Sequence, residues 1–111
     1  APGLTGVLAL PGGGVAGWGV DGTLIRLDAE GRVRFRVRIT EATHAPVGLP
    51  EDRVGWVGDD GVARTIGPEG AVVAERALSG PPTGAPRRGE RSTAYVPLGA
   101  RVVALDFALA L

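Results

Sequence analysis

The sequence predicts an all-β protein built from short antiparallel strands, and three observations support this prediction. A segment recurs at an offset of 39 residues, as from Asp21-Gly22 to Asp60-Gly61, and a repeat of roughly 20 to 50 residues is typical of stacked copies of one small unit. Glycine (19 residues) and proline (9 residues) are abundant although 44% of the chain is hydrophobic, which suits many strands joined by turns. No long stretch keeps a helical spacing of apolar residues without glycine or proline.

The first copy of the repeat divides into four candidate strands, at residues 4–10, 15–20, 23–28 and 32–39. Segments rich in glycine, proline and aspartate separate the candidates, and these residue types favour chain reversal. Four antiparallel strands in about 40 residues form one blade of a β-propeller.

The second copy shows the same strands more clearly, at residues 45–49, 53–58, 62–66 and 71–78. Its turns are Pro50-Glu51-Asp52, Asp59-Asp60-Gly61 and Gly67-Pro68-Glu69-Gly70. All three supply residues that tolerate or preset the backbone angles of a turn. A second complete blade is therefore expected.

The third copy is weaker and incomplete. At the same offset Val57 matches Val96 and Trp56 matches Tyr95. We expect strands at residues 84–87, 93–98 and 101–107, so that the blade lacks most or all of its outermost strand. Residues 104–111 are the one place where a short helical turn fits.

The expected fold class is therefore all-β, a partial β-propeller of about two and a half to three four-stranded antiparallel blades. Residues 1–111 are expected to form a single propeller segment. Its parts are blade 1 at about 4–41, blade 2 at about 45–80 and the incomplete blade 3 at about 84–111.

The best-preserved motif, AGWGVDGTLIRLDAEGRV at residues 16–33, resembles the PQQ-like repeat of the quinoprotein-like β-propeller superfamily in degenerate form. That superfamily includes the pyrroloquinoline-quinone alcohol dehydrogenases and the propeller lipoprotein of outer-membrane protein assembly. The sequence departs from the family pattern at the spacing of three from Asp28 to Gly31, and at Phe35 and Ala74, which stand where the family has tryptophan. We therefore expect the tryptophan contact between blades to be absent.

Closure of the propeller is the main structural problem that this sequence poses. A propeller arranges roughly four to eight blades in a ring, and fewer than three blades cannot close one. An open arc exposes an apolar blade face at each end, whereas monomers tolerate contiguous apolar patches of only a few hundred Å². The expected partner is therefore protein, either copies of the same chain or further blades of a larger propeller.

Composition argues against several other kinds of partner and site. Acidic and basic residues number 12 each, so no overall field favours nucleic acid, and no apolar stretch is long enough to span a membrane. Cysteine is absent, which leaves no disulfide and no thiolate ligand or nucleophile. We expect no catalytic residue, no cofactor and no metal. The chain begins with Ala1, which fits a removed signal peptide or a fragment, and a bacterial periplasmic, envelope or secreted location is expected.

Four arginines alternate with apolar residues: Arg32, Arg34, Arg36 and Arg38. A period of two predicts that all four lie on one face of a strand. Two interpretations are open: the row binds an anion or a protein partner through its guanidinium groups, or it protects the outermost strand of blade 1 from pairing with other sheets. We favour protection, because the equivalent strand of blade 2 keeps only Arg76.

Trp18, Trp56 and Tyr95 are the candidate interface aromatics, since aromatic side chains are favoured at interfaces. The two tryptophans are 38 residues apart, one short of the repeat, so they should point to opposite faces of equivalent strands. We expect both to pack between blades, with at most one at a central channel or an interface.

Three other patterns have simpler structural explanations. Gly12-Gly13-Gly14 is expected to be a hairpin turn, because a phosphate-binding loop also needs Lys-Ser/Thr and a following helix. Asp59-Asp60-Gly61 is expected to be a turn, because a calcium site needs about six to eight oxygen ligands. His44 is the only histidine and is expected in a loop between blades, with no catalytic partner.

The sequence favours a non-enzymatic scaffold or protein-interaction module, which presents loops or sheet edges to protein partners. The first alternative, implied by the family resemblance, is a fragment or subunit of a PQQ-dependent dehydrogenase whose cofactor, calcium and catalytic aspartate would come from other blades. The second alternative is a carbohydrate-binding propeller that uses the aromatic residues as stacking platforms.

Overall fold

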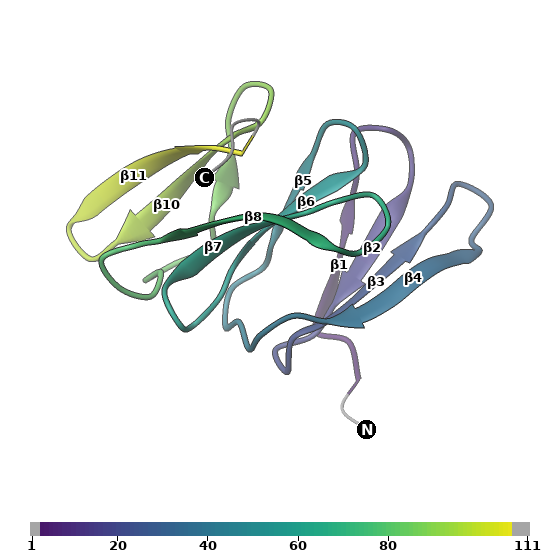
Figure 1. Cartoon of the computed structure of the whole chain (residues 1–111), viewed down its shortest axis with the longest axis horizontal. Helices are drawn as coiled ribbons and strands as arrows, with labels where there is room; N and C mark the ends of the chain where they lie inside the picture. The colour runs from purple at the N-terminus through teal and green to yellow at the C-terminus, as the bar shows by residue number, and fades with distance from the viewer. Residues whose placement is uncertain (1–2, 108–111) are drawn as a thin grey trace.

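The computed structural model describes residues 3–107, which form eleven β-strands in three antiparallel sheets and no helix (Figure 1). The sheets lie one after another in a body of 40 × 31 × 19 Å, with the second sheet between the other two. The all-β prediction and the expected partial propeller are confirmed.

The first sheet contains β1 (Gly6–Ala9), β2 (Val15–Trp18), β3 (Thr23–Leu27) and β4 (Val33–Arg38), hydrogen-bonded in the order β1-β2-β3-β4. Each strand falls within its predicted range and each pairs with its neighbour along the chain. The strands alternate residues between two faces, so paired residues on neighbouring strands share a face.

The second sheet repeats this topology with β5 (Val47–Leu49), β6 (Arg53–Val57), β7 (Val62–Ile66) and β8 (Val72–Ala77). In both sheets the register shifts where the third strand meets the fourth, between Arg26 and Leu27 and again between Thr65 and Ile66. The repeat in the sequence is therefore a repeat in structure, including its irregularity.

The third sheet contains β9 (Arg87–Arg88), β10 (Thr93–Leu98) and β11 (Arg101–Asp106), and within residues 3–107 it has no fourth strand. The inner strand was expected at residues 84–87 but overlaps β9 only at Arg87. The helical turn suggested for residues 104–111 is wrong for residues 104–106, which belong to β11, and residues 108–111 lie outside the described part.

Strand register shows that the third copy does not follow the sequence offset in β10. In the second sheet Trp56 pairs with Arg64. The residue 39 positions after Arg64 is Val103, and in the third sheet Val103 pairs with Val96. The hairpin between β10 and β11 is therefore one residue shorter than its counterpart. Val96 is the structural equivalent of Trp56, so the expected match of Trp56 with Tyr95 is wrong.

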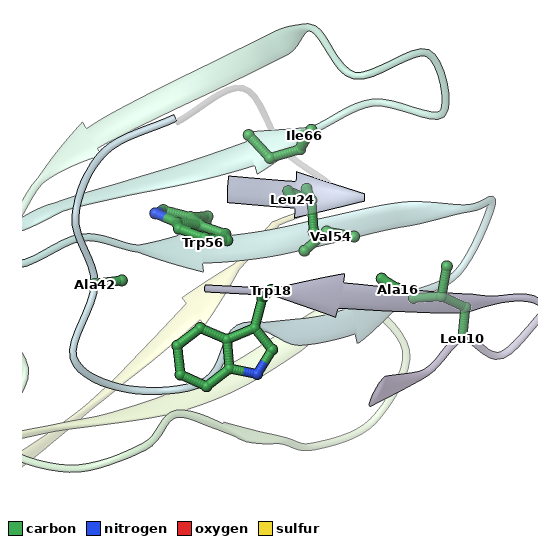
Figure 2. Close-up of a cluster of buried hydrophobic side chains, with 8 residues drawn as sticks. All are labelled: Leu10, Ala16, Trp18, Leu24, Ala42, Val54, Trp56 and Ile66. Carbon is green, nitrogen blue, oxygen red and sulfur yellow. The ribbon is translucent and has the colours of Figure 1, made fainter. Parts of the chain in front are cut away.

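Two hydrophobic clusters hold the three sheets together. Trp18 from the first sheet and Trp56 from the second lie in the first cluster, in which Trp56 is completely buried (Figure 2). The buried members of this cluster are Leu10, Ala16, Trp18, Leu24, Ala42, Val54, Trp56 and Ile66. Those of the second cluster, between the second and third sheets, are Val47, Leu49, Val57, Ala63, Ala94, Val96, Leu105 and Phe107.

A phenylalanine makes the contact between blades for which the family pattern has tryptophan. The Phe35 side chain lies over the turn at Gly70, so that a Cβ atom on Gly70 would stand 2.9 Å from Phe35 Cδ1 and 3.0 Å from Val37 Cγ1. Gly70 has φ of 92°, a conformation that side chains disfavour. Tryptophan is absent here as expected, but the docking contact itself is present.

Candidate interaction surface

The second sheet is covered on both faces, whereas the first and third sheets each leave one face uncovered by the described residues. Residues of the second sheet occur in both hydrophobic clusters, while the first sheet contributes to one cluster and the third sheet to the other. The uncovered faces are the candidate interaction surface, and we call them the N-terminal and C-terminal end faces.

The N-terminal end face follows from strand register, because residues paired across strands share a face. Val7 pairs with Gly17, which pairs with Ile25, and Val15 pairs with Leu27, which pairs with Val33. Its exposed apolar side chains include Val7 (75% exposed), Val33 (63%) and Val15 (37%). This face presents apolar side chains to solvent from all four strands.

Leu4 partly covers this face. A Cβ atom on Gly17 would lie 2.6 Å from Leu4 Cδ1, so the leucine side chain lies over the space that glycine leaves on β2. Leu4 remains 47% exposed. A single leucine therefore stands where a whole sheet covers the equivalent face of the second sheet.

The C-terminal end face is defined in the same way by the pairing of Tyr95 with Ala104 and Arg87, and of Pro97 with Val102. Tyr95 is 46% exposed and Val102 is 67% exposed. The opposite face of this sheet carries Ala94, Val96 and Leu105, all completely buried. One side of the third sheet is thus a packed interface and the other side is open.

The aromatic candidates divide between these two environments. Trp18 and Trp56 lie on sheet faces that point toward each other, and both are buried between the blades as expected. The indole N–H of Trp56 donates a hydrogen bond of 3.2 Å to the carbonyl oxygen of Thr40. Of the three aromatics, Tyr95 alone is accessible to a partner in this structure.

The arginine row lies at the outer edge of the first sheet, because β4 is the last strand in the sheet order. The row is not continuous. Arg32 precedes β4, and the register shift leaves Arg34 without a paired residue, whereas Arg36 pairs with Ile25. Arg38 pairs with Thr23 and forms an ion pair of 3.0 Å with Asp21. The register places Arg36 and Arg38 on the N-terminal end face, and a shared face for all four arginines stays a prediction.

An ion pair between blades, which joins a buried arginine to a partly exposed aspartate, was not predicted from the sequence. The Arg26 guanidinium is 3% exposed and its Nη2 lies 2.8 Å from Asp52 Oδ1, on the β5–β6 turn of the next sheet. A second guanidinium nitrogen donates to the carbonyl of Leu27, and Nε has no hydrogen-bond partner. The one sequence signal was an arginine within an apolar strand, at the position where the second copy has Thr65.

Acidic residues in the turns have structural partners. The backbone N–H of Thr23 donates to Asp21 and holds the pKa of that carboxyl below its usual value. The Arg64 guanidinium donates a hydrogen bond of 2.8 Å to Asp60 and likewise holds the pKa of that carboxyl below its usual value. Asp59 accepts hydrogen bonds from the backbone and hydroxyl of Thr43, which tie the connection between blades to this turn.

Other sequence patterns fall at structural positions. Gly12-Gly13-Gly14 lies in the β1–β2 turn, where the backbone N–H of Leu10 donates to the carbonyl of Gly14 at 2.8 Å, as a hairpin requires. His44 is half-buried in the connection between the first and second sheets. Over residues 3–107, no three histidine, cysteine, aspartate or glutamate side chains are grouped to hold a metal ion. The same residues form no helix of the length and apolarity needed to cross a membrane.

Comparison with known proteins identifies the fold. No family model and no curated protein matches the sequence. Among solved structures 39 chains match, and one of them is the crystal structure of BamB from Moraxella catarrhalis, with a TM-score of 0.75 and 22% sequence identity. The chain has the fold of part of a β-propeller. The match covers 92% of this chain but 34% of the BamB chain, so the present chain spans about a third of that protein's length.

Proposed function

We propose that this chain is a non-enzymatic scaffold or protein-interaction module, a three-blade segment of a larger or oligomeric PQQ-like β-propeller. Its partners are further blades, which bind the N-terminal and C-terminal end faces. A bacterial periplasmic, envelope or secreted location is part of this proposal. The shared fold with BamB supports the architecture, and the two open end faces support the role.

The observation that carries the proposal is a difference in burial between equivalent residues. Val54 on the second sheet is 1% exposed, whereas Val15, which lies 39 positions earlier on the first sheet, is 37% exposed. Ile66 is completely buried, and its equivalent Leu27 is only half-buried. At these positions the end face has apolar side chains like those of an internal blade face, but no covering sheet.

Two measurements on the 111-residue chain test this function. Native mass spectrometry reports whether the chain associates, and the fluorescence of anilinonaphthalene sulfonate reports exposed apolar surface. We expect either association or dye binding, and we expect Val7→Asp to reduce whichever is observed. The matched control is Val73→Asp, which places the same charge on an exposed residue of β8, the outer strand of the second sheet, away from both end faces. A monomer that binds no dye, with Val7→Asp indistinguishable from the control, would show that the end faces bind nothing.

The arginines of β4 have a separate proposed role, protection of the outer sheet edge. An edge strand exposes unpaired backbone groups, and charged side chains oppose pairing with another sheet. Replacing Arg34 and Arg36 with threonine should increase aggregation, measured by light scattering. Arg32→Thr, outside the strand, is the control. Unchanged solubility combined with weaker association would instead make these arginines part of the binding surface.

A further inference from the structure

The two end faces point in opposite directions along the chain, and this difference limits which partner can bind them. Each internal interface joins a face that points forward along the chain to a face that points backward. In the second strand of each sheet, one forward-pointing position is occupied by Ala16, Gly55 and Tyr95 in turn. These three residues are equivalent because the residues with which they pair, Arg26, Thr65 and Ala104, follow one another at intervals of 39 positions. The C-terminal end face is therefore a forward face, and the N-terminal end face is a backward face.

The backward-pointing residues of the same strands are Gly17, Trp56 and Val96, whose partners Ile25, Arg64 and Val103 follow the same spacing. Inside the chain, each small forward residue belongs to an interface filled by larger backward side chains. Ala16 shares its cluster with Trp56. A Cβ atom on Gly55 would lie 2.9 Å from Val47 Cγ2 of its own sheet and 3.2 Å from Phe107 Cζ, which follows β11.

At the two end faces the order is reversed, because the forward residue is large and the backward residue is small. The forward end carries Tyr95, which is 46% exposed, and the backward end carries Gly17, over which only Leu4 lies. Interfaces inside proteins are filled to nearly constant density, so a large residue on one face calls for a small residue on the other. The tyrosine supplies volume that the glycine face lacks.

Resting on the proposed role of the end faces, we propose that the partner is a second copy of this chain, docked head to tail with its N-terminal end face against Tyr95. Two copies supply six sheets, which falls within the range of roughly four to eight blades that closes a propeller. The same contact then occurs twice around a two-fold axis, and a head-to-tail interface of this kind ends in a closed ring. Both new interfaces continue the packing of the two internal ones.

Mixing two face-specific variants tests this arrangement. Val7→Asp disables the N-terminal end face and Val102→Asp disables the C-terminal end face, on side chains that are 75% and 67% exposed and so do not support the fold. Head-to-tail docking predicts that each variant alone is monomeric. An equal mixture should form heterodimers, because one intact face of each kind remains. Native mass spectrometry with one variant labelled with nitrogen-15 distinguishes heterodimers from homodimers.

The remaining outcomes separate this inference from the proposed function. The wild-type chain and the Val73→Asp control should be dimeric, and Tyr95→Ala should weaken the dimer about 10-fold or more. Homodimers of either variant alone would indicate like-to-like docking and overturn the inference. A monomeric wild-type chain whose dye binding is reduced by Val7→Asp would also overturn it, while leaving the end faces as sites for blades of another segment.

Discussion

Two equivalent glycines allow the contribution of the contact between blades to be measured. Gly31 and Gly70 lie 39 residues apart in the same turn, with φ of 84° and 92°. A Cβ atom on Gly70 would stand within 3.0 Å of Phe35 and Val37, whereas no atom lies within 4 Å of the same position on Gly31. Alanine at each site therefore has the same backbone cost, but only Gly70→Ala disturbs the interface.

The magnitudes follow from these two effects. A left-handed backbone costs a residue with a side chain about 1–2 kcal/mol, and both variants lose this amount of unfolding free energy. Overpacking a filled contact adds about 1–3 kcal/mol, and only Gly70→Ala should show this addition. The expected result is a loss of about 1–2 kcal/mol for Gly31→Ala and of about 2–5 kcal/mol for Gly70→Ala.

Urea denaturation followed by circular dichroism measures both values, at one protein concentration because association with a partner would change the apparent stability. In a Phe35→Ala background, Gly70→Ala should cost less than in the wild type, since the main obstacle to the new methyl group has been removed. Equal losses for the two glycine variants, or no coupling to Phe35, would refute the docking of Phe35 on this turn.

Three further predictions follow from the ion pair between Arg26 and Asp52, the acidic turns and the tryptophans. Asp52→Asn should destabilise the chain more than Arg26→Leu in urea titrations, because it leaves a guanidinium that is 3% exposed without its counterion. Folding lowers the pKa of Asp60 from 3.8, so the stabilisation by its ionised carboxyl is complete above pH 3.8 and is lost as the pH falls through the folded-state pKa. Asp60→Asn should therefore lose less stability in acid than the wild type does. Trp18 and Trp56 are 6% and 0% exposed, so iodide should quench tryptophan fluorescence only weakly until the chain unfolds.

The strands of the first two blades could be predicted from the sequence because local signals and the repeat agree. Turn residues at Asp21-Gly22 and Asp60-Gly61 fix where each hairpin reverses, and the alternation of apolar residues sets which face is buried. The burial of Trp18 and Trp56 between blades was also predictable, since a shift of one residue within a strand reverses the face. Those predictions depend on spacing alone.

Contacts between blades could not be predicted in this way. The pairing of Arg26 with Asp52 joins residues from two sheets, and no periodicity in either strand indicates it. Phe35 was recognised only as a departure from a tryptophan pattern, whereas its packing on Gly70 depends on how the first two sheets approach each other. Sequence patterns specify each blade, and the distance between blades decides these contacts.

The C-terminal end face shows how a small change in one hairpin determines the candidate site. Because the β10–β11 hairpin is one residue shorter than the β6–β7 hairpin, alignment at a constant offset puts Tyr95 in the place of Trp56, in a buried interface. The actual register puts Tyr95 on the opposite face, where Ala16 and Gly55 are its equivalents. A shift of one residue reverses the face of a side chain, so the shorter hairpin places Tyr95, the aromatic residue of β10, on the outer face of the sheet and not in the core, where Phe107 lies. The shorter hairpin, which also weakens the repeat in the sequence, therefore accounts for the exposed tyrosine on which the proposed docking of another blade rests.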